Sequence, residues 1–369
     1  MSQPSSIVGI LREPTRTTES VESSALIVGA AVFAASAVLG LVLFWGSALP
    51  IAGRGSLGAA VAIGAAVVAV LAFATGQFVL RRRFGSLPVA GASVDPPTPA
   101  DGTVPVLHWF DVLALSIAHA VIALLGWTGL ADVLEQSFIG AEVFTIPAAL
   151  LFGVALALTA YVSFLSSVRM TPMLLSLVLA VFLVVGVITA MLSASDPQWW
   201  QENLSALGMT DDISALAFNL TLIIAGAIVT IVARYATSGL PAGTAEEQRG
   251  RDLVRYGLVL IGVLLACVGI FPVDEFFLVH NTVATGMAVV YTVIVIGLPR
   301  FLPSMPRVFV ILGWAYVGVI VVLGVFFAVG YYNLTAVELV AGVLIFSWII
   351  LFLRNTGSVA ARRVVAVTA

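Results

Sequence analysis

The chain contains recurrent runs of about twenty apolar residues, the length that a helix needs to cross a bilayer core of about 30 Å. Proline, glycine and arginine separate these runs, as is typical of turns between helices. The sequence therefore predicts an all-α fold, a polytopic transmembrane helical bundle of about ten spans. We expect these spans at residues 25–49, 57–80, 109–132, 143–166, 173–193, 214–235, 255–272, 281–299, 308–331 and 335–353.

Composition supports a membrane protein and excludes several other classes. The 369 residues are 61% hydrophobic and 9% charged, whereas soluble domains carry roughly 25% charged residues. The net charge of -3 provides no cationic surface for nucleic acid. All 16 basic residues are arginine, which is typical of a GC-rich bacterial genome. The single Cys267 excludes an internal disulfide and a cysteine-rich metal site.

The arginines predict the orientation of the spans. Cytoplasmic segments of membrane proteins carry an excess of basic residues. If the N-terminus is cytoplasmic, ten spans leave only Arg54 on the outer side. The outer loops then collect carboxylates, among them Asp196, Asp274 and Glu275. We therefore expect a multi-pass protein of a bacterial cytoplasmic (inner) membrane, with both termini cytoplasmic.

The spans and polar segments suggest a division of the chain. The expected parts are a cytoplasmic polar tail (1–24), a two-helix transmembrane hairpin (25–83), a flexible cytoplasmic linker rich in Pro and Gly (84–107), two further spans (108–172), a six-helix membrane domain (173–354) and a cytoplasmic tail (355–369). The Ala, Val and Gly of the hairpin permit close helix packing. They favour a second copy or another membrane protein as partner, or they are simply lipid-facing filler.

Two outer loops hold most of the unusual polar residues. In residues 193–214, Trp199 and Trp200 are expected to anchor the loop at headgroup level. In residues 269–281 (GIFPVDEFFLVHN), two carboxylates precede His280. This stretch is either a reactive or binding site or an interfacial turn in which His280 caps a helix. Zinc normally needs three or four protein ligands, and the chain has only three histidines. Paired axial ligation of haem would need a second inward histidine at a suitable depth. We therefore expect no metal and no cofactor.

Polar residues inside apolar spans are scarce and therefore informative. His119 lies near the middle of the third expected span, and Glu338 lies just inside the outer end of the tenth. A hydrogen bond to a neighbouring helix would explain His119 without any ligand. Alternatively, both residues are buried titratable groups of a transporter.

The loops and the helices that follow them resemble a known family. The segments WWQENLSALG, ISALAFNLTLIIAG and GIFPVDEFFLVHN are similar to the bacterial and archaeal six-helix family called domain of unknown function 998, over about residues 173–354. The matching positions are Ser205, Leu207, Gly208, Asn219, Gly269, Phe271, Pro272 and His280. The pattern is also loosely similar to membrane proteins of the damage-regulated autophagy modulator type. The resemblance implies a six-helix topology and lipid-linked roles, but no particular activity.

These observations favour an outward-facing polar pocket in the last six spans. Its expected lining is Asn203, Ser205, Asn219, Asp274, Glu275 and His280, with Trp199 and Trp200 at the rim. Because apolar and aromatic residues flank the polar ones, we expect membrane lipids as partners and non-catalytic binding of a lipid or lipid-linked headgroup. A small-molecule or proton-coupled transporter using His119 and Glu338 is the alternative. A third possibility is an intramembrane hydrolase that uses His280 with Asp274 or Glu275.

Overall fold

The computed structural model describes residues 18–85, 107–209, 212–238, 240 and 243–368; for 18–19, 82–85, 172 and 357–368 it describes the backbone alone. The expected linker at 84–107 thus falls almost entirely outside the described residues. The chain divides after Thr171 into two compact units, here called the N-terminal and the C-terminal unit. This division lies beside the start of the expected six-helix domain.

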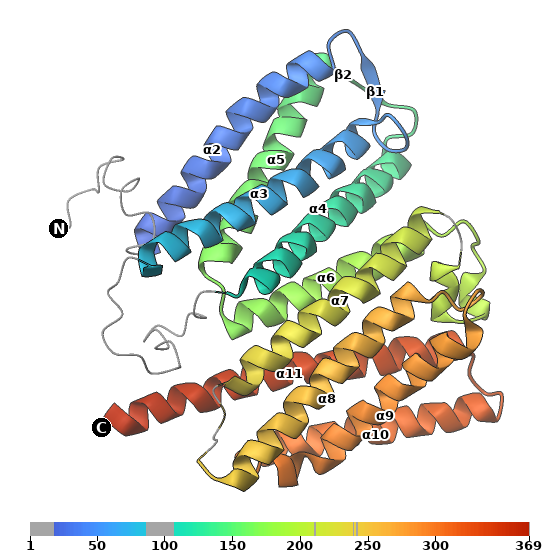
Figure 1. Cartoon of the computed structure of the whole chain (residues 1–369). Coiled ribbons are helices and arrows are strands. Elements are labelled where there is room, and N and C mark those ends of the chain that lie inside the picture. Colours follow the sequence, from blue (N-terminus) through green and yellow to red (C-terminus); the bar gives the residue numbers. More distant parts are fainter. Residues whose placement is uncertain (1–17, 86–106, 210–211, 239, 241–242, 369) are drawn as a thin grey trace. The chain divides into compact units, whose positions relative to one another are not determined.

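The N-terminal unit is a four-helix bundle. Its helices are α2 (Thr18–Leu43), α3 (Leu57–Gly85), α4 (Trp109–Ser137) and α5 (Thr145–Val168). Helix α2 packs along α5, and α3 packs against both α4 and α5 (Figure 1). The first two helices and the next two therefore share one core, in which small residues such as Ala65 and Ala69 lie against Phe152.

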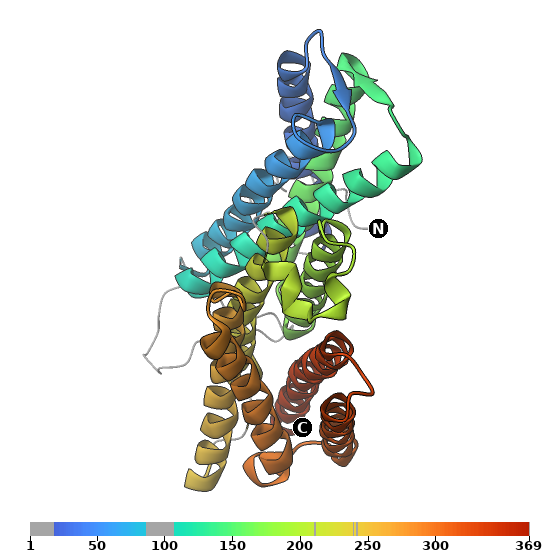
Figure 2. The same cartoon turned by 90° about the vertical axis from the view of Figure 1, so that its right-hand side faces the viewer.

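Two short strands close one end of this bundle. Strand β1 (Ala48–Pro50) pairs antiparallel with β2 (Glu142–Phe144), and both strands lie at the same end of the bundle in Figures 1 and 2. The first helix was expected to continue to residue 49 but ends at Leu43. Gly46 explains this end, because its φ of +73° is a left-handed conformation that does not continue a helix.

The C-terminal unit contains six long helices and two short 3₁₀ helices. They are α6 (Pro172–Leu192), η1 (Trp199–Gln201), η2 (Leu204–Gly208), α7 (Ile213–Ser238), α8 (Ala245–Ile270), α9 (Phe277–Phe301), α10 (Arg307–Ala328) and α11 (Leu334–Thr368). Helix α7 packs between α6 and α8, and α9 packs on the other side of α8. Helix α11 contacts α6, α7 and α10.

A close helix crossing in this unit joins α7 to α8 through two glycines. A Cβ added to Gly262 would lie 2.5 Å from the carbonyl oxygen of Gly226 and 2.6 Å from Thr230 Oγ1. A Cβ on Gly226 would in turn overlap the carbonyl oxygen of Gly262. Small residues at such positions let helix backbones approach closely within a membrane.

Ten helices in the described part of the chain are long and apolar enough to cross a membrane. This confirms the expected number of spans and the all-helical class, and it indicates a multi-pass membrane protein. The seventh span begins earlier than expected, at Ala245. The reason is a capping box at the start of the helix. The side chains of Thr244 and Glu247 each accept a hydrogen bond from the other residue's backbone N–H, so the helix begins in the polar segment before the apolar run. Which end faces the cytoplasm stays a prediction.

Candidate functional site

The loop between α6 and α7 is fixed to one end of the C-terminal unit by two long-range hydrogen bonds. The backbone N–H of Leu204 donates to Glu338 Oε2 at 2.6 Å, and Asn333 Nδ2 donates to the carbonyl oxygen of Trp200 at 2.9 Å. Glu338 and Asn333 lie at the start of α11. The α6–α7 loop is therefore tied to the turn between α10 and α11, at η1 and at the start of η2.

Ser205 and His280 join this loop to the turn between α8 and α9. Ser205 Oγ lies 2.9 Å from His280 Nε2, and His280 Nδ1 lies 2.7 Å from the carbonyl oxygen of Phe271. A carbonyl oxygen only accepts, so Nδ1 carries the proton of the neutral ring and Nε2 accepts from the serine hydroxyl. Both side chains are buried. One imidazole thus holds together η2, the end of α8 and the first turn of α9.

Asn219 fixes the same loop to α7. Its Nδ2 donates to the carbonyl oxygen of Gly208 at 3.0 Å. A Cβ on Gly208 would lie 2.5 Å from Asn219 Oδ1, and one on Gly269 would lie 2.5 Å from the Asn219 carbonyl oxygen. Both glycines are therefore required for close approach. Most of the residues that carried the family resemblance contact one another here, which gives the sequence pattern a packing role.

Asn203 is one of several residues at this end whose bonding is incomplete; Ser193 Oγ and Thr335 Oγ1 are also buried without a partner among the described residues. Asn203 Oδ1 is shielded from solvent and accepts no hydrogen bond from any group in the described part of the chain. A buried acceptor without a donor costs about 1–3 kcal/mol. A donor from a bound molecule or from water would remove this cost. We call Asn203, Ser205, His280 and Glu338 the loop cluster.

The other predicted lining residues lie apart from the loop cluster. Asp274 and Glu275 are exposed in the turn between α8 and α9. Trp199 is half-buried, and Trp200 is 50% exposed. The structure therefore brings Ser205 together with His280, and places Asn219 at the back of η2. Sequence reasoning did not find the role of Glu338 in holding the loop.

His119 lies in the N-terminal unit, with a set of contacts that parallels His280. Its Nδ1 is 2.8 Å from the carbonyl oxygen of Leu115, and its Nε2 is 2.9 Å from Ser166 Oγ on α5. Its ring centroid lies 4.6 Å from that of Phe73 on α3. The hydrogen bond to a neighbouring helix that the sequence suggested is present. His119 therefore links α4 with α5 and packs against α3.

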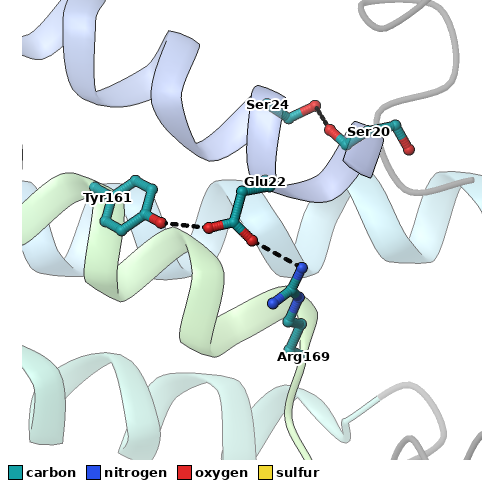
Figure 3. A network of polar contacts seen from close by, with 5 residues as sticks. All are labelled: Ser20, Glu22, Ser24, Tyr161 and Arg169. Atoms are coloured by element: carbon teal, nitrogen blue, oxygen red, sulfur yellow. Dashed lines mark hydrogen bonds and ion pairs between the residues drawn. The ribbon is translucent and has the colours of Figure 1, made fainter. Parts of the chain in front are cut away.

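A polar network at the start of α2 was missed by sequence reasoning (Figure 3). Tyr161 Oη donates to Glu22 Oε1 at 2.7 Å, and an Arg169 guanidinium nitrogen lies 3.0 Å from Glu22 Oε2. Ser24 Oγ donates to the carbonyl oxygen of Ser20 beside them. The network joins α2 to the end of α5. A carboxylate in the first turn of an apolar span was the available signal.

Within the described residues, no group of three or more His, Cys, Asp or Glu side chains is placed to hold a metal ion. Comparison with protein-family models, with curated proteins and with solved structures found no match to this chain. The resemblance to the six-helix family of unknown function therefore stays a prediction.

Proposed function

We propose that this protein binds membrane lipids through their headgroups at the loop cluster, on the outer side of a bacterial cytoplasmic membrane and with both termini cytoplasmic. The observation that carries the proposal is the shielded Oδ1 of Asn203, which lacks a donor among the described residues. A headgroup N–H or O–H would supply that donor. Binding of this kind needs no reaction step.

The charges at this end favour a particular headgroup chemistry. Asp196, Glu202, Asp274 and Glu275 are exposed there. No arginine occurs in residues 193–209 or 271–276. Such a surface repels a headgroup with net negative charge and attracts a donor-rich one. The ligand class is therefore a lipid whose headgroup offers an ammonium group or sugar hydroxyls.

Apolar side chains around the loop cluster support a position at the membrane interface. Trp200 is 50% exposed, and Phe277 and Leu278 of the first turn of α9 are 65% and 78% exposed. Aromatic residues are enriched at headgroup level, where one part of the ring is apolar and another is wet. The loop cluster would then lie at the depth of the headgroups.

Lipid-dependent thermal unfolding tests this proposal. The purified full chain is heated in detergent micelles supplemented with phosphatidylethanolamine, phosphatidylcholine or a neutral glycolipid. We expect phosphatidylethanolamine or the glycolipid to raise the unfolding temperature, since a ligand that binds only the folded state stabilises it. Phosphatidylcholine has no N–H donor and should raise the unfolding temperature less.

The variant for this test is Asn203→Leu, which removes the acceptor and retains a side chain of similar size. The selective stabilisation by donor-bearing lipids should disappear in Asn203→Leu and persist in the matched control Gln198→Leu, an exposed site in the same loop. Equal stabilisation by all three lipids, unchanged in Asn203→Leu, would refute headgroup recognition here.

A second candidate function is favoured by the Ser205–His280 pair. A serine hydroxyl 2.9 Å from a histidine whose other nitrogen is held by a carbonyl oxygen is the arrangement of a nucleophile with its general base. In ester hydrolysis, Ser205 Oγ would attack the carbonyl carbon while Nε2 takes the hydroxyl proton. That proton would then pass to the departing alcohol. Water would release the acid from the serine.

Labelling with a fluorophosphonate distinguishes this candidate from plain binding. A hydrolase should be labelled at Ser205, with the label lost in Ser205→Ala and strongly reduced in His280→Gln. Ser166 offers an internal control. It makes the same contact with His119, but each of these two residues lies within a candidate membrane span. Absence of label at Ser205 in the folded wild type would exclude the hydrolase.

A further inference from the structure

A groove lies between α4 and α5 in the N-terminal unit, with a volume of about 310 Å³. This volume is at the lower end of ligand pockets, which measure roughly 300–1,000 Å³. Its lining includes His119, Trp127, Leu130, Leu158, Val162 and Ser163. From residue 119 to residue 130 the groove follows α4 for about 16 Å, at a rise of 1.5 Å per residue. This length suits a hydrocarbon chain.

The groove contains no charged side chain, and most of its polar groups already have partners. His119 contacts Leu115 and Ser166, as described above. Trp127 Nε1 donates to Thr159 Oγ1 at 3.0 Å, and Thr159 Oγ1 donates to the carbonyl oxygen of Ala155 at 2.8 Å. Nothing here would compensate the burial of a charged group. The part of a ligand that enters must therefore be uncharged.

Ser163 is the exception among the polar groups of the groove. It is 3% exposed and lines the groove. No hydrogen bond of its hydroxyl is found within the described part of the chain. The hydroxyl can therefore donate to an ester carbonyl or lie beside a double bond of a chain in the groove.

The two helices that form the groove indicate that lipid surrounds it. Both helices are candidate membrane spans, Trp109–Ser137 and Thr145–Val168. The rim residues Leu130, Leu158 and Val162 are 45%, 53% and 57% exposed. In a bilayer, exposed apolar side chains at this depth contact lipid tails. We propose that the groove is a binding site for an acyl chain of a membrane phospholipid, separate from the loop cluster.

Photocrosslinking tests this inference on the full chain. The protein is reconstituted into vesicles of phosphatidylethanolamine and phosphatidylglycerol that contain a phospholipid with a diazirine on its acyl chain. After illumination, the crosslinked peptides are mapped. We expect crosslinks to concentrate in residues 119–130 and 158–163. Equal yields on all lipid-facing spans would show a non-specific lipid shell and would overturn the proposal.

Substitutions that fill the groove provide the control for specific binding. Val162→Trp, at an exposed rim position, and Ser163→Phe should each cause a severalfold loss of these crosslinks. Leu151→Trp is the matched control, because Leu151 is 53% exposed on the same helix and does not line the groove. Unchanged crosslinking in Val162→Trp would contradict the proposal. Asn203→Leu should leave these crosslinks unchanged, so the two lipid sites can fail independently.

Discussion

At the scale of single residues, both buried histidines of this chain make the same pair of contacts. Each carries its proton on Nδ1 toward a backbone carbonyl oxygen and accepts a serine hydroxyl at Nε2. The contacts of His119 lie within and between two helices. Those of His280 join a loop, a helix end and a helix start. The same chemistry therefore positions a helix pair in one unit and a loop in the other.

Removal of the His280 ring should destabilise the C-terminal unit. In His280→Ala, Ser205 Oγ and the Phe271 carbonyl oxygen lose their partner, and a buried group left unpaired costs about 1–3 kcal/mol. Thermal unfolding of the purified protein measures this loss. Asn281→Ala is the control, since the Asn281 side chain bonds only within its own helix, to Phe277; we expect a change of no more than about 0.5 kcal/mol.

A double-mutant cycle isolates the contact between Ser205 and His280. The effects of Ser205→Ala and His280→Ala should be coupled, because residues in one hydrogen-bonded pair show interaction energies of about 0.5–3 kcal/mol. Effects that simply add would mean that the two side chains stabilise the protein separately, contrary to their contact at 2.9 Å.

The sequence predicted part of this residue-scale arrangement. Ser205 and His280 were expected to share a site, because the topology places both loops on the same side of the membrane. Their direct contact, and the role of Glu338, were not predictable in detail. Both depend on the path of the α6–α7 loop, which is fixed by bonds such as that from Leu204 to Glu338. Bonds between a side chain and a distant backbone group produce no periodic signal in the sequence.

At the scale of elements, the number of spans was predictable and their ends were less so. Apolar length alone identifies a span, and ten were found. The end of α2 at Leu43 depends on one glycine conformation, and the start of α8 depends on a capping box. The strands β1 and β2 have three residues each, too few to show an alternating pattern. Local backbone chemistry decided each of these differences.

The crossing of α7 and α8 should be sensitive to added volume. Gly262→Val would force its new side chain against the backbone of Gly226, and overpacking of this kind typically costs about 1–3 kcal/mol. A lower unfolding temperature in detergent would show the loss. Gly318→Ala in α10 is the control, because a Cβ there meets nothing within 4 Å. We expect no loss in Gly318→Ala; equal behaviour of both variants would contradict the close crossing.

At the scale of the whole molecule, the orientation in the membrane is the expectation on which the lipid proposal depends. Ser195 and Asp274 are exposed at the end of the C-terminal unit that carries the loop cluster, and Glu246 is exposed in the first turn of α8, at the opposite end. The arginine distribution predicts that the first end faces outside.

Cysteine labelling tests this orientation. In a Cys267→Ala background, Ser195→Cys and Asp274→Cys should react with a membrane-impermeant maleimide on intact cells. Glu246→Cys should react only after the membrane is permeabilised. Cys267 is the chain's single cysteine, so its removal leaves each new thiol as the one site of reaction. The reverse pattern would place the loop cluster in the cytoplasm.

Native mass spectrometry of the purified protein tests whether the loop cluster binds a lipid headgroup. The lipids retained by wild type, Asn203→Leu and His280→Ala are identified by mass and compared. We expect wild type to retain a lipid with an amine or sugar headgroup, and Asn203→Leu and His280→Ala to lose it. Gln198→Leu should keep it. Identical lipid profiles in all four proteins would contradict a headgroup site at the loop cluster.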